Sequence, residues 1–495
     1  MSILTSVDSF GGIDADTDQL LDACFETHDA YRAVLSHQKY LILGRKGSGK
    51  TAIFRKLIRA NGSNVFSYGH TFSDYPWHYH DKQKKIGVPN EQCFLHSWEY
   101  LIYMTLAKVF LNVDQSQPWS DRAAQEVSAL ETFVVDTYGS RDPDVSQIFS
   151  PTRSLRLKPT LGLNWHFVKA EIHPEQVPMD YLPMVIQDVN RRLMEAVVTS
   201  ANPDSEYFIC FDELDLGFSK TDRDYALKLI GLLLAARKIN DVTRDAGKKL
   251  RVVIFLRDDI YQELQFEDKN KITEGGSARI EWETGELDNS LRVLMEKRFA
   301  KVFSIPETGS WAQVFDETRS MSGHQPKYQH IIDRTFLRPR DIIKFCNEVL
   351  IAHKKRTDVR PDRFDNEDVS NARQAYSEYF LNELDDEIHK NVPAYKEYLE
   401  ILKTINSAVF KKELLDEAWE NRKEILPPSV SPRDLLAQLF EFSIIGYYRP
   451  GGGGGGSDYV WKYRDRRALF NENAATYRVH PGFVEVLGIR RYTWG

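Results

Sequence analysis

The order of apolar and polar residues predicts strands that alternate with helices in the first half of the chain. Helical spacing of apolar residues runs from 20 to 34, from 52 to 58 and from 227 to 236. Apolar runs of strand length lie at 40–43, 65–68, 207–211 and 252–256. Because strands that alternate with helices form parallel sheets, we expect an α/β fold built on a parallel sheet.

A long insertion separates the second predicted strand from the third. Roughly 140 residues lie between them, far more than a crossover helix needs. Apolar residues at helical spacing at 98–110 and at 185–198 predict two helices in this stretch. We therefore expect a helical insertion at about 70–200, in which the pattern of 150–172 stays ambiguous.

The second half of the chain is predicted to be mostly helical, with a hairpin near its end. Helical patterns cover 365–389, 399–405 and 435–440, and strand-like runs at 444–448 and 459–463 flank six glycines, Gly451 to Gly456. Helices followed by a hairpin are typical of a winged helix. We expect a core at 1–300, a helical lid and connector at 301–390, and a winged-helix domain at 391–495.

Composition excludes several classes of protein. Of the 495 residues, 42% are hydrophobic and 28% charged, which is typical of globular proteins. No apolar run approaches a bilayer span, so we expect no membrane association. The 65 basic and 72 acidic residues leave a net charge of −7, so any nucleic-acid site must be a local patch.

Cysteine usage and the first residues favour a cytoplasmic location. The four cysteines lie far apart and form no CxxC pair: Cys24, Cys93, Cys210 and Cys346. The first residues have neither the basic start nor the apolar stretch of a signal peptide. We therefore expect a reducing, cytoplasmic environment.

The strongest motif is a glycine-rich loop between the first predicted strand and the helix after it. Residues 44–51, Gly-Arg-Lys-Gly-Ser-Gly-Lys-Thr, match G-x-x-x-x-G-K-[ST], a phosphate-binding loop. We expect Lys50 to reach the β- and γ-phosphates and the Thr51 hydroxyl to bind Mg²⁺. The full set of expected nucleotide contacts in this loop is Gly44, Arg45, Lys46, Gly47, Ser48, Gly49, Lys50, Thr51 and Ala52.

A second set of candidates follows the buried strand at 207–211. Asp212 and Glu213 come at its end, where ionised groups need a metal or another partner. We expect Asp212 to complete the Mg²⁺ shell and Glu213 to activate the attacking water. For Asp215 two roles stay open, shaping the turn or contacting a neighbouring subunit.

Several arginines are candidates for sensing the γ-phosphate. Arg257 ends the strand at 252–256, where an ion pair with Asp258, Asp259 or a metal-binding carboxylate is the alternative. Arg340 or Arg338, near a predicted helix start in the lid, is a second candidate, with solvated helix-capping charges as its alternative. Arg298 is a weaker candidate for an arginine finger supplied across a subunit interface.

Together these motifs resemble the signal-transducing and origin-recognition branch of P-loop ATPases. The Gly-Gly-Ile-Asp-Ala-Asp-Thr-Asp opening, Phe-Leu-Arg-Asp-Asp-Ile-Tyr and Arg-Pro-Arg-Asp-Ile-Ile are also similar to a poorly characterised bacterial P-loop ATPase family found in phage-defence settings. The resemblance implies an ATP-driven switch that assembles into homo-oligomers and passes its state to a separate effector protein. No effector domain or repeat-built sensor is recognisable in this chain.

Two other sites carry weaker signals. His70, Asp74, His78 and His80 include an H-x-H that zinc accepts, but an aromatic surface loop is the favoured reading. The expected recognition helix at 431–441 offers Arg433 against two acidic residues, so DNA binding is an alternative that we do not favour. The basic residues of the wing and tail leave it open: Lys462, Arg464, Arg466, Arg467, Arg478, Arg490 and Arg491.

The sequence as a whole predicts an Mg²⁺-dependent ATPase. The guanine-specific motif N-K-x-D has no match, since 270–273 read Asn-Lys-Ile-Thr without the aspartate, and ATP is therefore the expected nucleotide. Hydrolysis is expected to control a conformational or oligomeric switch, and the resemblance implies that this switch belongs to a bacterial antiphage defence system. The alternative is an ATP-gated initiator or loader that grips DNA through its winged helix.

Overall fold

A computed structural model places most of the chain. It describes residues 3–490 apart from 61, 63, 73–76, 78–79, 82–93, 150–181, 216–221, 286–288, 358–360, 390–391, 428–429 and 452–457. The chain forms two compact units, one made of residues 27–281 and the other of residues 1–26 together with 282–495.

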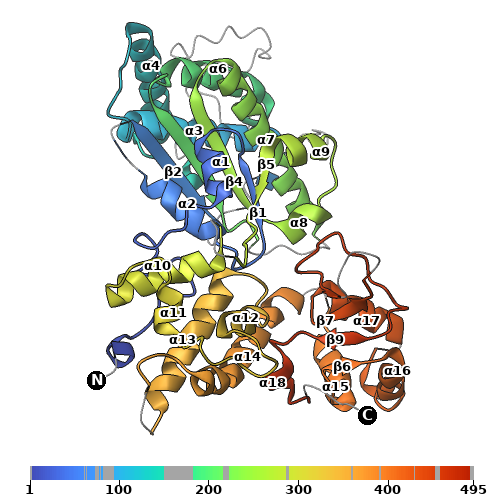
Figure 1. Cartoon of the computed structure of the whole chain (residues 1–495). Coiled ribbons are helices and arrows are strands. Elements are labelled where there is room, and N and C mark those ends of the chain that lie inside the picture. Colours follow the sequence, from blue (N-terminus) through green and yellow to red (C-terminus); the bar gives the residue numbers. More distant parts are fainter. Residues whose placement is uncertain are drawn as a thin grey trace. The chain divides into compact units, whose positions relative to one another are not determined.

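A five-stranded parallel sheet organises the unit at 27–281 (Figure 1). Its strands are β1 (Leu41–Gly44), β2 (Val65–Thr71), β3 (Glu206–Asp212), β4 (Lys249–Arg257) and β5 (Ser277–Arg279), in the order β2-β3-β4-β1-β5. Four of them confirm the strands predicted from apolar runs. The sequence reasoning missed β5 because this strand has three residues and none of them is buried.

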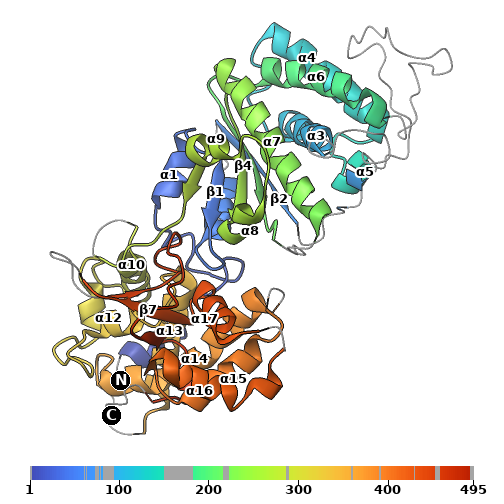
Figure 2. The ribbon, with the colours of Figure 1, turned by 90° about the vertical axis from the view of Figure 1, so that its right-hand side faces the viewer.

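Helices cover both faces of this sheet. One face packs against α3 (Leu95–Asn112) and α7 (Arg223–Asp245), with α4 (Asp121–Tyr138) and α6 (Leu182–Ser200) outside α3 (Figure 2). The short α5 (Val145–Phe149) also contacts α3. The predicted helical insertion is confirmed for 94–149 and 182–200, whereas the ambiguous stretch at 150–172 lies outside the described residues.

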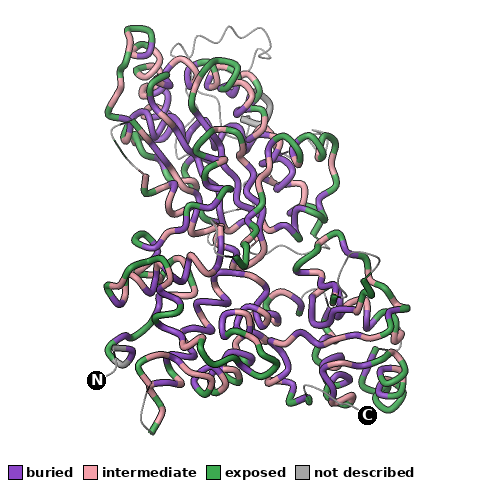
Figure 3. Tube along the Cα trace, in the orientation of Figure 1, coloured by how far each residue is buried: buried purple, intermediate pink, exposed green. Residues whose placement is uncertain are grey.

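The opposite face carries α1 (Asp29–Leu35) and α2 (Lys50–Arg59). The Phe54 ring of α2 packs edge-on against Phe255 of β4, with 5.9 Å between the ring centroids. Strands buried on both faces show long runs of buried residues, as Figure 3 shows for this sheet. Burial of both faces of the sheet therefore explains why its strands appear as continuous apolar runs in the sequence.

The helix expected at 20–34 is wrong in its first half. Regular helix begins at Asp29, and the residues before it form turns. The Asp18 carboxylate accepts hydrogen bonds from the backbone N–H groups of Gly12 and Leu20. Because an aspartate that bonds to nearby backbone offers the chain an alternative to helix, turns replace the predicted first helical turns.

The N-terminal segment packs on the helices of its own unit. The fully buried Phe10 ring lies 4.9 Å from the Phe299 ring and 5.9 Å from the Phe303 ring, measured between centroids. Arg298 forms a buried ion pair with Asp18 at 2.6 Å. Residues nearly 300 positions apart therefore share one core.

Two parts make up the remainder of this unit. Its first helices are α10 (Leu291–Phe303), α11 (Ser310–Val314), α12 (Lys327–Ile332), α13 (Pro339–Lys355) and α14 (Asn366–Ile388). A capping box between Asp365 and Asp368 begins α14, which confirms the long helix predicted at 365–389. Buried side chains of α13 and α14 belong to the same core as Phe10.

The C-terminal part combines helices with a small antiparallel sheet. Its elements are α15 (Tyr395–Ile405), β6 (Val409–Phe410), α16 (Lys412–Glu420), α17 (Pro432–Glu441), β7 (Ile445–Arg449), β8 (Asp458–Val460), β9 (Tyr477–Val479) and α18 (Val484–Leu487). The strand order is β6-β9-β7-β8, and β7 and β8 form the predicted hairpin. Of the six glycines, 452–456 lie outside the described residues.

In the described part of the chain, no helix is both long enough and apolar enough to cross a membrane.

Candidate functional site

Three strands of the parallel sheet end at the edge where the predicted site residues lie. Gly44 of β1 stands in register with Arg257 of β4, and Phe211 of β3 stands in register with Ile254. Because β4 lies between β1 and β3, the residues that follow all three strands meet at this edge. Ligands of open α/β sheets bind outside the carboxyl ends of the strands.

The loop after β1 leads directly into α2. Gly47 has a φ of 76° and Gly49, the N-cap of α2, a φ of 101°, conformations that side-chain-bearing residues rarely adopt. These glycines let the backbone turn into the helix, whose first N–H groups and dipole attract anions. The Lys50 ammonium donates to the carbonyl oxygens of Gly44 and Arg45, both at 3.0 Å, and so folds back over the loop.

Burial and two carboxylates act on Lys50 in opposite directions. Burial lowers the pKa of the Lys50 ammonium, while the negative charges of Asp215 and Asp212 act to raise it. A cation held in a poorly solvated place attracts an anion more strongly than a solvated one does. Lys50 is therefore suited to hold a phosphate group at this loop.

Thr51 and Asp212 meet although 160 residues separate them in sequence. The Thr51 hydroxyl donates a hydrogen bond to the Asp212 carboxylate, and the backbone N–H of Glu213 donates to it as well. Burial raises the pKa of Asp212, against the effect of these two hydrogen bonds. Within the described part of the chain, no donor reaches the buried Oδ2 atom of Asp212.

This pair fits a magnesium ion. Mg²⁺ prefers oxygen ligands and takes few of them from protein. A hydroxyl and a carboxylate beside the glycine-rich loop supply such oxygens. The unsatisfied Oδ2 of Asp212 needs a cation or a donor, because burial makes an unpaired charge costly. Among the described residues, no group of three or more His, Cys, Asp or Glu forms a metal cluster elsewhere.

Glu213 adopts a left-handed backbone conformation directly after β3, with a φ of 61°. For a residue with a side chain this conformation costs about 1 kcal/mol, and such costs are concentrated at functional sites. Glycine would fit this position more easily.

Replacing Glu213 tests this strain. We expect Glu213→Gly to be more stable than Glu213→Ala by about 1 kcal/mol, because only glycine adopts a positive φ without a steric penalty. Urea unfolding of the two variants, compared at the same pH and salt, measures the difference. Equal stability of the two variants would contradict the strain.

Arg257 ends β4 between two carboxylates. Its Nε atom donates to Oδ1 of Asp259 at 3.1 Å and its Nη2 atom to Oδ2 at 2.7 Å, a two-pronged pair. Its Nη1 atom lies 3.5 Å from Oδ2 of Asp215. Burial alone would raise the pKa of Asp259, but the adjacent Arg257 guanidinium lowers it below its ordinary value.

The other arginine candidates lie in the unit at 282–495, each in an ion pair. Arg340 binds Glu383 at 2.9 Å and the backbone oxygen of Ile13 at 3.1 Å. Arg338 is buried and paired with Asp341 and Glu387, both at 2.9 Å. Arg298 is paired with Asp18 and only 3% of its side chain is exposed, so it anchors the N-terminal segment.

The histidines of the weaker zinc candidate are separated from one another by their partners. His70 forms a hydrogen bond with Thr105 and His80 with Ser97. Burial lowers the pKa of each of these two histidines to about 3. Asp74 and His78 lie outside the described residues. For His70 and His80 the expected surface loop is wrong, because both side chains are buried in the core.

Sequence reasoning missed one charged residue at this edge of the sheet. Arg279 ends β5, and its Nε atom lies 3.3 Å from Oδ1 of the buried Asp258. Leu43, the residue before the loop, stands in register with Arg279. No sequence signal identified it, because β5 is too short to be recognised by its pattern.

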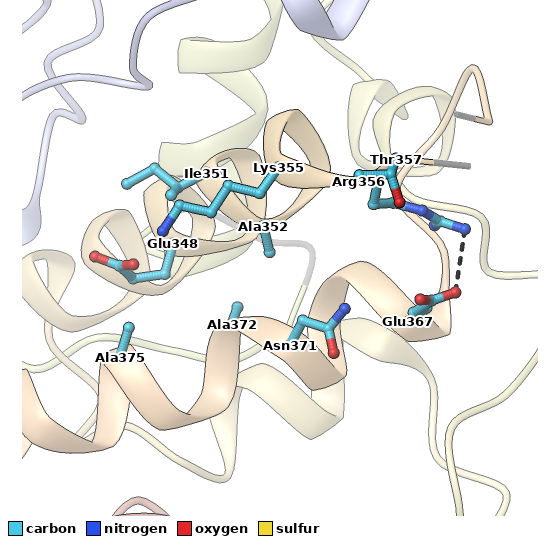
Figure 4. A pocket seen from close by; sticks show the side chains of 10 residues that line it. All are labelled: Glu348, Ile351, Ala352, Lys355, Arg356, Thr357, Glu367, Asn371, Ala372 and Ala375. Carbon is cyan, nitrogen blue, oxygen red and sulfur yellow. Dashed lines mark hydrogen bonds and ion pairs between the residues drawn. The ribbon is translucent and has the colours of Figure 1, made fainter. Parts of the chain in front are cut away.

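A pocket in the other unit lies between α13 and α14 (Figure 4). Alanines form part of its wall, at Ala352, Ala372 and Ala375. Arg356 at its rim binds Glu367 at 3.1 Å and also pairs with Asp365 and Asp368. These pairs join the end of α13 to the start of α14, so this arginine has a structural role.

Comparison with known proteins adds two similarities. The family of FunZ-associated C-terminal helical domains matches residues 289–385, which include α10 to α13 and most of α14. The chain is also similar to the "Putative transposon gamma-delta 80.3 kDa protein" of Escherichia coli (strain K12), with 20% identity over 375 residues. That alignment covers 71% of this chain and 48% of the other protein, so the chain spans about half the length of the curated relative it matches.

Proposed function

We propose that this protein is an Mg²⁺-dependent ATPase of the P-loop class. The observation that carries the proposal is the hydrogen bond between Thr51 and Asp212, which brings the end of the glycine-rich loop to the end of β3. A hydroxyl and a carboxylate in contact, beside a partly buried lysine on a loop of backbone N–H groups, are the groups that hold a nucleotide phosphate with its metal ion.

Each residue of this edge then has a role. The loop residues 44–52 and the Lys50 ammonium bind the phosphates, and Thr51 and Asp212 hold the Mg²⁺ ion, which neutralises charge on the phosphate oxygens when bound. Glu213 orients and deprotonates the attacking water. Arg257 detects the terminal phosphate, and Arg340 is a second sensor in the helical region.

We further propose that nucleotide turnover drives a conformational or oligomeric switch. Two covalent connections, at 26/27 and at 281/282, join the two units, and the second follows β5 by two residues. The Nε2 atom of His28 lies 2.9 Å from the Glu281 carbonyl oxygen, so the residues beside the two connections are hydrogen-bonded to each other. This bond supports a proposal in which both connections respond together.

The partner of such a switch is proposed to be a separate effector protein in a bacterial antiphage system. The helical region at 289–385, which is similar to the family of FunZ-associated C-terminal helical domains, is proposed to pass the state of the switch to this partner. The C-terminal part, with α15 to α17 and the β7-β8 hairpin, is proposed to be a winged helix that docks on protein.

An ATP-gated DNA-binding role is the second candidate, because the printed name of the distant relative refers to a transposon. Several basic side chains of this part are already neutralised: Arg433 pairs with Glu472, Lys462 with Glu441 and Arg464 with Asp333. DNA binding that weakens steeply with salt and disappears in Arg466→Ala/Arg467→Ala would favour this candidate.

The ATPase proposal is tested with the full chain. We expect ATP hydrolysis that needs Mg²⁺ and stops in EDTA, together with a change in particle mass or hydrodynamic radius between a non-hydrolysable ATP analogue and ADP. Light scattering coupled to size separation measures the second quantity. Absence of nucleotide binding would overturn the proposal, and an unchanged particle in both states would overturn the switch.

A further inference from the structure

Asp215 lies beside Arg257, the cation that ends β4 at the carboxyl edge of the sheet. Its Oδ2 atom is 3.5 Å from the Nη1 atom of Arg257, and 29% of the Asp215 side chain and 15% of the Arg257 side chain are exposed. The negative charge of Asp215 therefore neutralises part of the charge that Arg257 presents at this edge.

The two partners of Arg257 differ in strength. Asp259 binds two nitrogens of the guanidinium at 3.1 and 2.7 Å, whereas Asp215 binds one at 3.5 Å. Two-pronged pairs between arginine and carboxylate are strong and directional, whereas a single long contact is weak. Asp259 therefore fixes the guanidinium, and the contact with Asp215 is the one that another anion can replace.

We propose that Asp215 is a place-holder for the terminal phosphate of the nucleotide, an inference that rests on the proposed function. In the absence of a triphosphate its carboxylate pairs with Arg257. A γ-phosphate brings more negative charge to this guanidinium and displaces Asp215 from it. ADP lacks that phosphate and leaves the contact in place, so Asp215 determines how strongly the site distinguishes ATP from ADP.

Displacement of the Asp215 side chain can be transmitted to helix α7. Asp215 follows Leu214, whose backbone oxygen accepts a hydrogen bond from the Tyr225 hydroxyl at 3.0 Å. Tyr225 lies in the first turn of α7, and the Asp222 side chain caps that turn by accepting from its backbone N–H. A carboxylate that moves at 215 therefore acts on the start of α7, which covers the sheet.

Asp215→Asn tests the proposal. It removes the charge and keeps the shape, so we expect affinity for a non-hydrolysable ATP analogue with Mg²⁺ to rise about tenfold and affinity for ADP to change less than about threefold. Equilibrium titration of the full chain with fluorescent nucleotides measures both. Asp204→Asn, an exposed aspartate before the opposite end of β3, is the matched control and should change neither affinity.

Asp259→Asn is expected to change affinity for the ATP analogue in the opposite direction. It removes the two-pronged anchor of Arg257, so affinity for the ATP analogue should fall while affinity for ADP is nearly kept. If Asp215→Asn does not fold, Asp215→Ser makes the same charge change. A wild-type chain that binds neither nucleotide overturns the proposed function itself. A wild-type chain that binds both, with unchanged or weaker analogue binding in the Asp215 variants, overturns only the place-holder.

Discussion

Glu213→Gln is expected to bind ATP with near wild-type affinity and to hydrolyse it about 10²–10⁴-fold more slowly. Glutamine has the size of glutamate and still forms hydrogen bonds, but its amide does not accept a proton from water. Glu213 directly follows Asp212, so the variant keeps the proposed metal and phosphate contacts. Single-turnover hydrolysis of labelled ATP, after binding has been measured separately, gives the two quantities.

The matched control for this variant lies on the same strand. Glu206→Gln makes the identical chemical change at the first residue of β3, at the opposite end of the sheet. It should leave both binding and turnover unchanged. Unimpaired hydrolysis in Glu213→Gln would show that another group activates the water.

Lys50→Met is expected to lower ATP affinity by about a hundredfold. The ammonium is the cation at the first position of α2, and its loss removes a charge-assisted contact to the phosphates in a poorly solvated place. Methionine keeps most of the side-chain volume, so the loop and helix should persist. Titration with a fluorescent ATP analogue measures the loss.

A control separates lost binding from lost folding in this variant. Arg59→Ala removes a cation from the exposed last residue of α2 and should keep ATP affinity. Thermal melting should show that the wild-type chain, Lys50→Met and Arg59→Ala are all folded. Unchanged affinity in Lys50→Met would exclude the loop as the phosphate site.

Much of the fold was predictable because burial leaves a pattern in the sequence. The sheet strands at 41–44, 206–212 and 249–257 are buried on both faces, and such strands show continuous apolar runs. The helices at 95–112, 182–200 and 366–388 repeat apolar residues at helical spacing. The predicted α/β class with a parallel sheet is therefore confirmed.

Other elements left no such pattern. Strand β5 has three residues, none of which is buried. The turns at 19–24 contain apolar residues at helical spacing although they form no helix. Leu21 and Cys24 are buried there although no helix forms. The periodicity of apolar residues indicates which positions are buried. An irregular segment that packs against a core can therefore show the same pattern as a helix.

The candidate site divides in the same way. The sequence by itself determined the candidate groups that are neighbours in the chain: the loop at 44–51 and the acidic pair Asp212 and Glu213. Such a motif is recognisable because its residues follow one another in the chain. Only the tertiary structure decided that Asp215 contacts Arg257, and it gave Arg257 the two-pronged pair with Asp259 that the sequence had left as an alternative. The reason is physical, since strand order and register bring these groups together, and neither property is encoded in the spacing of residues along one strand.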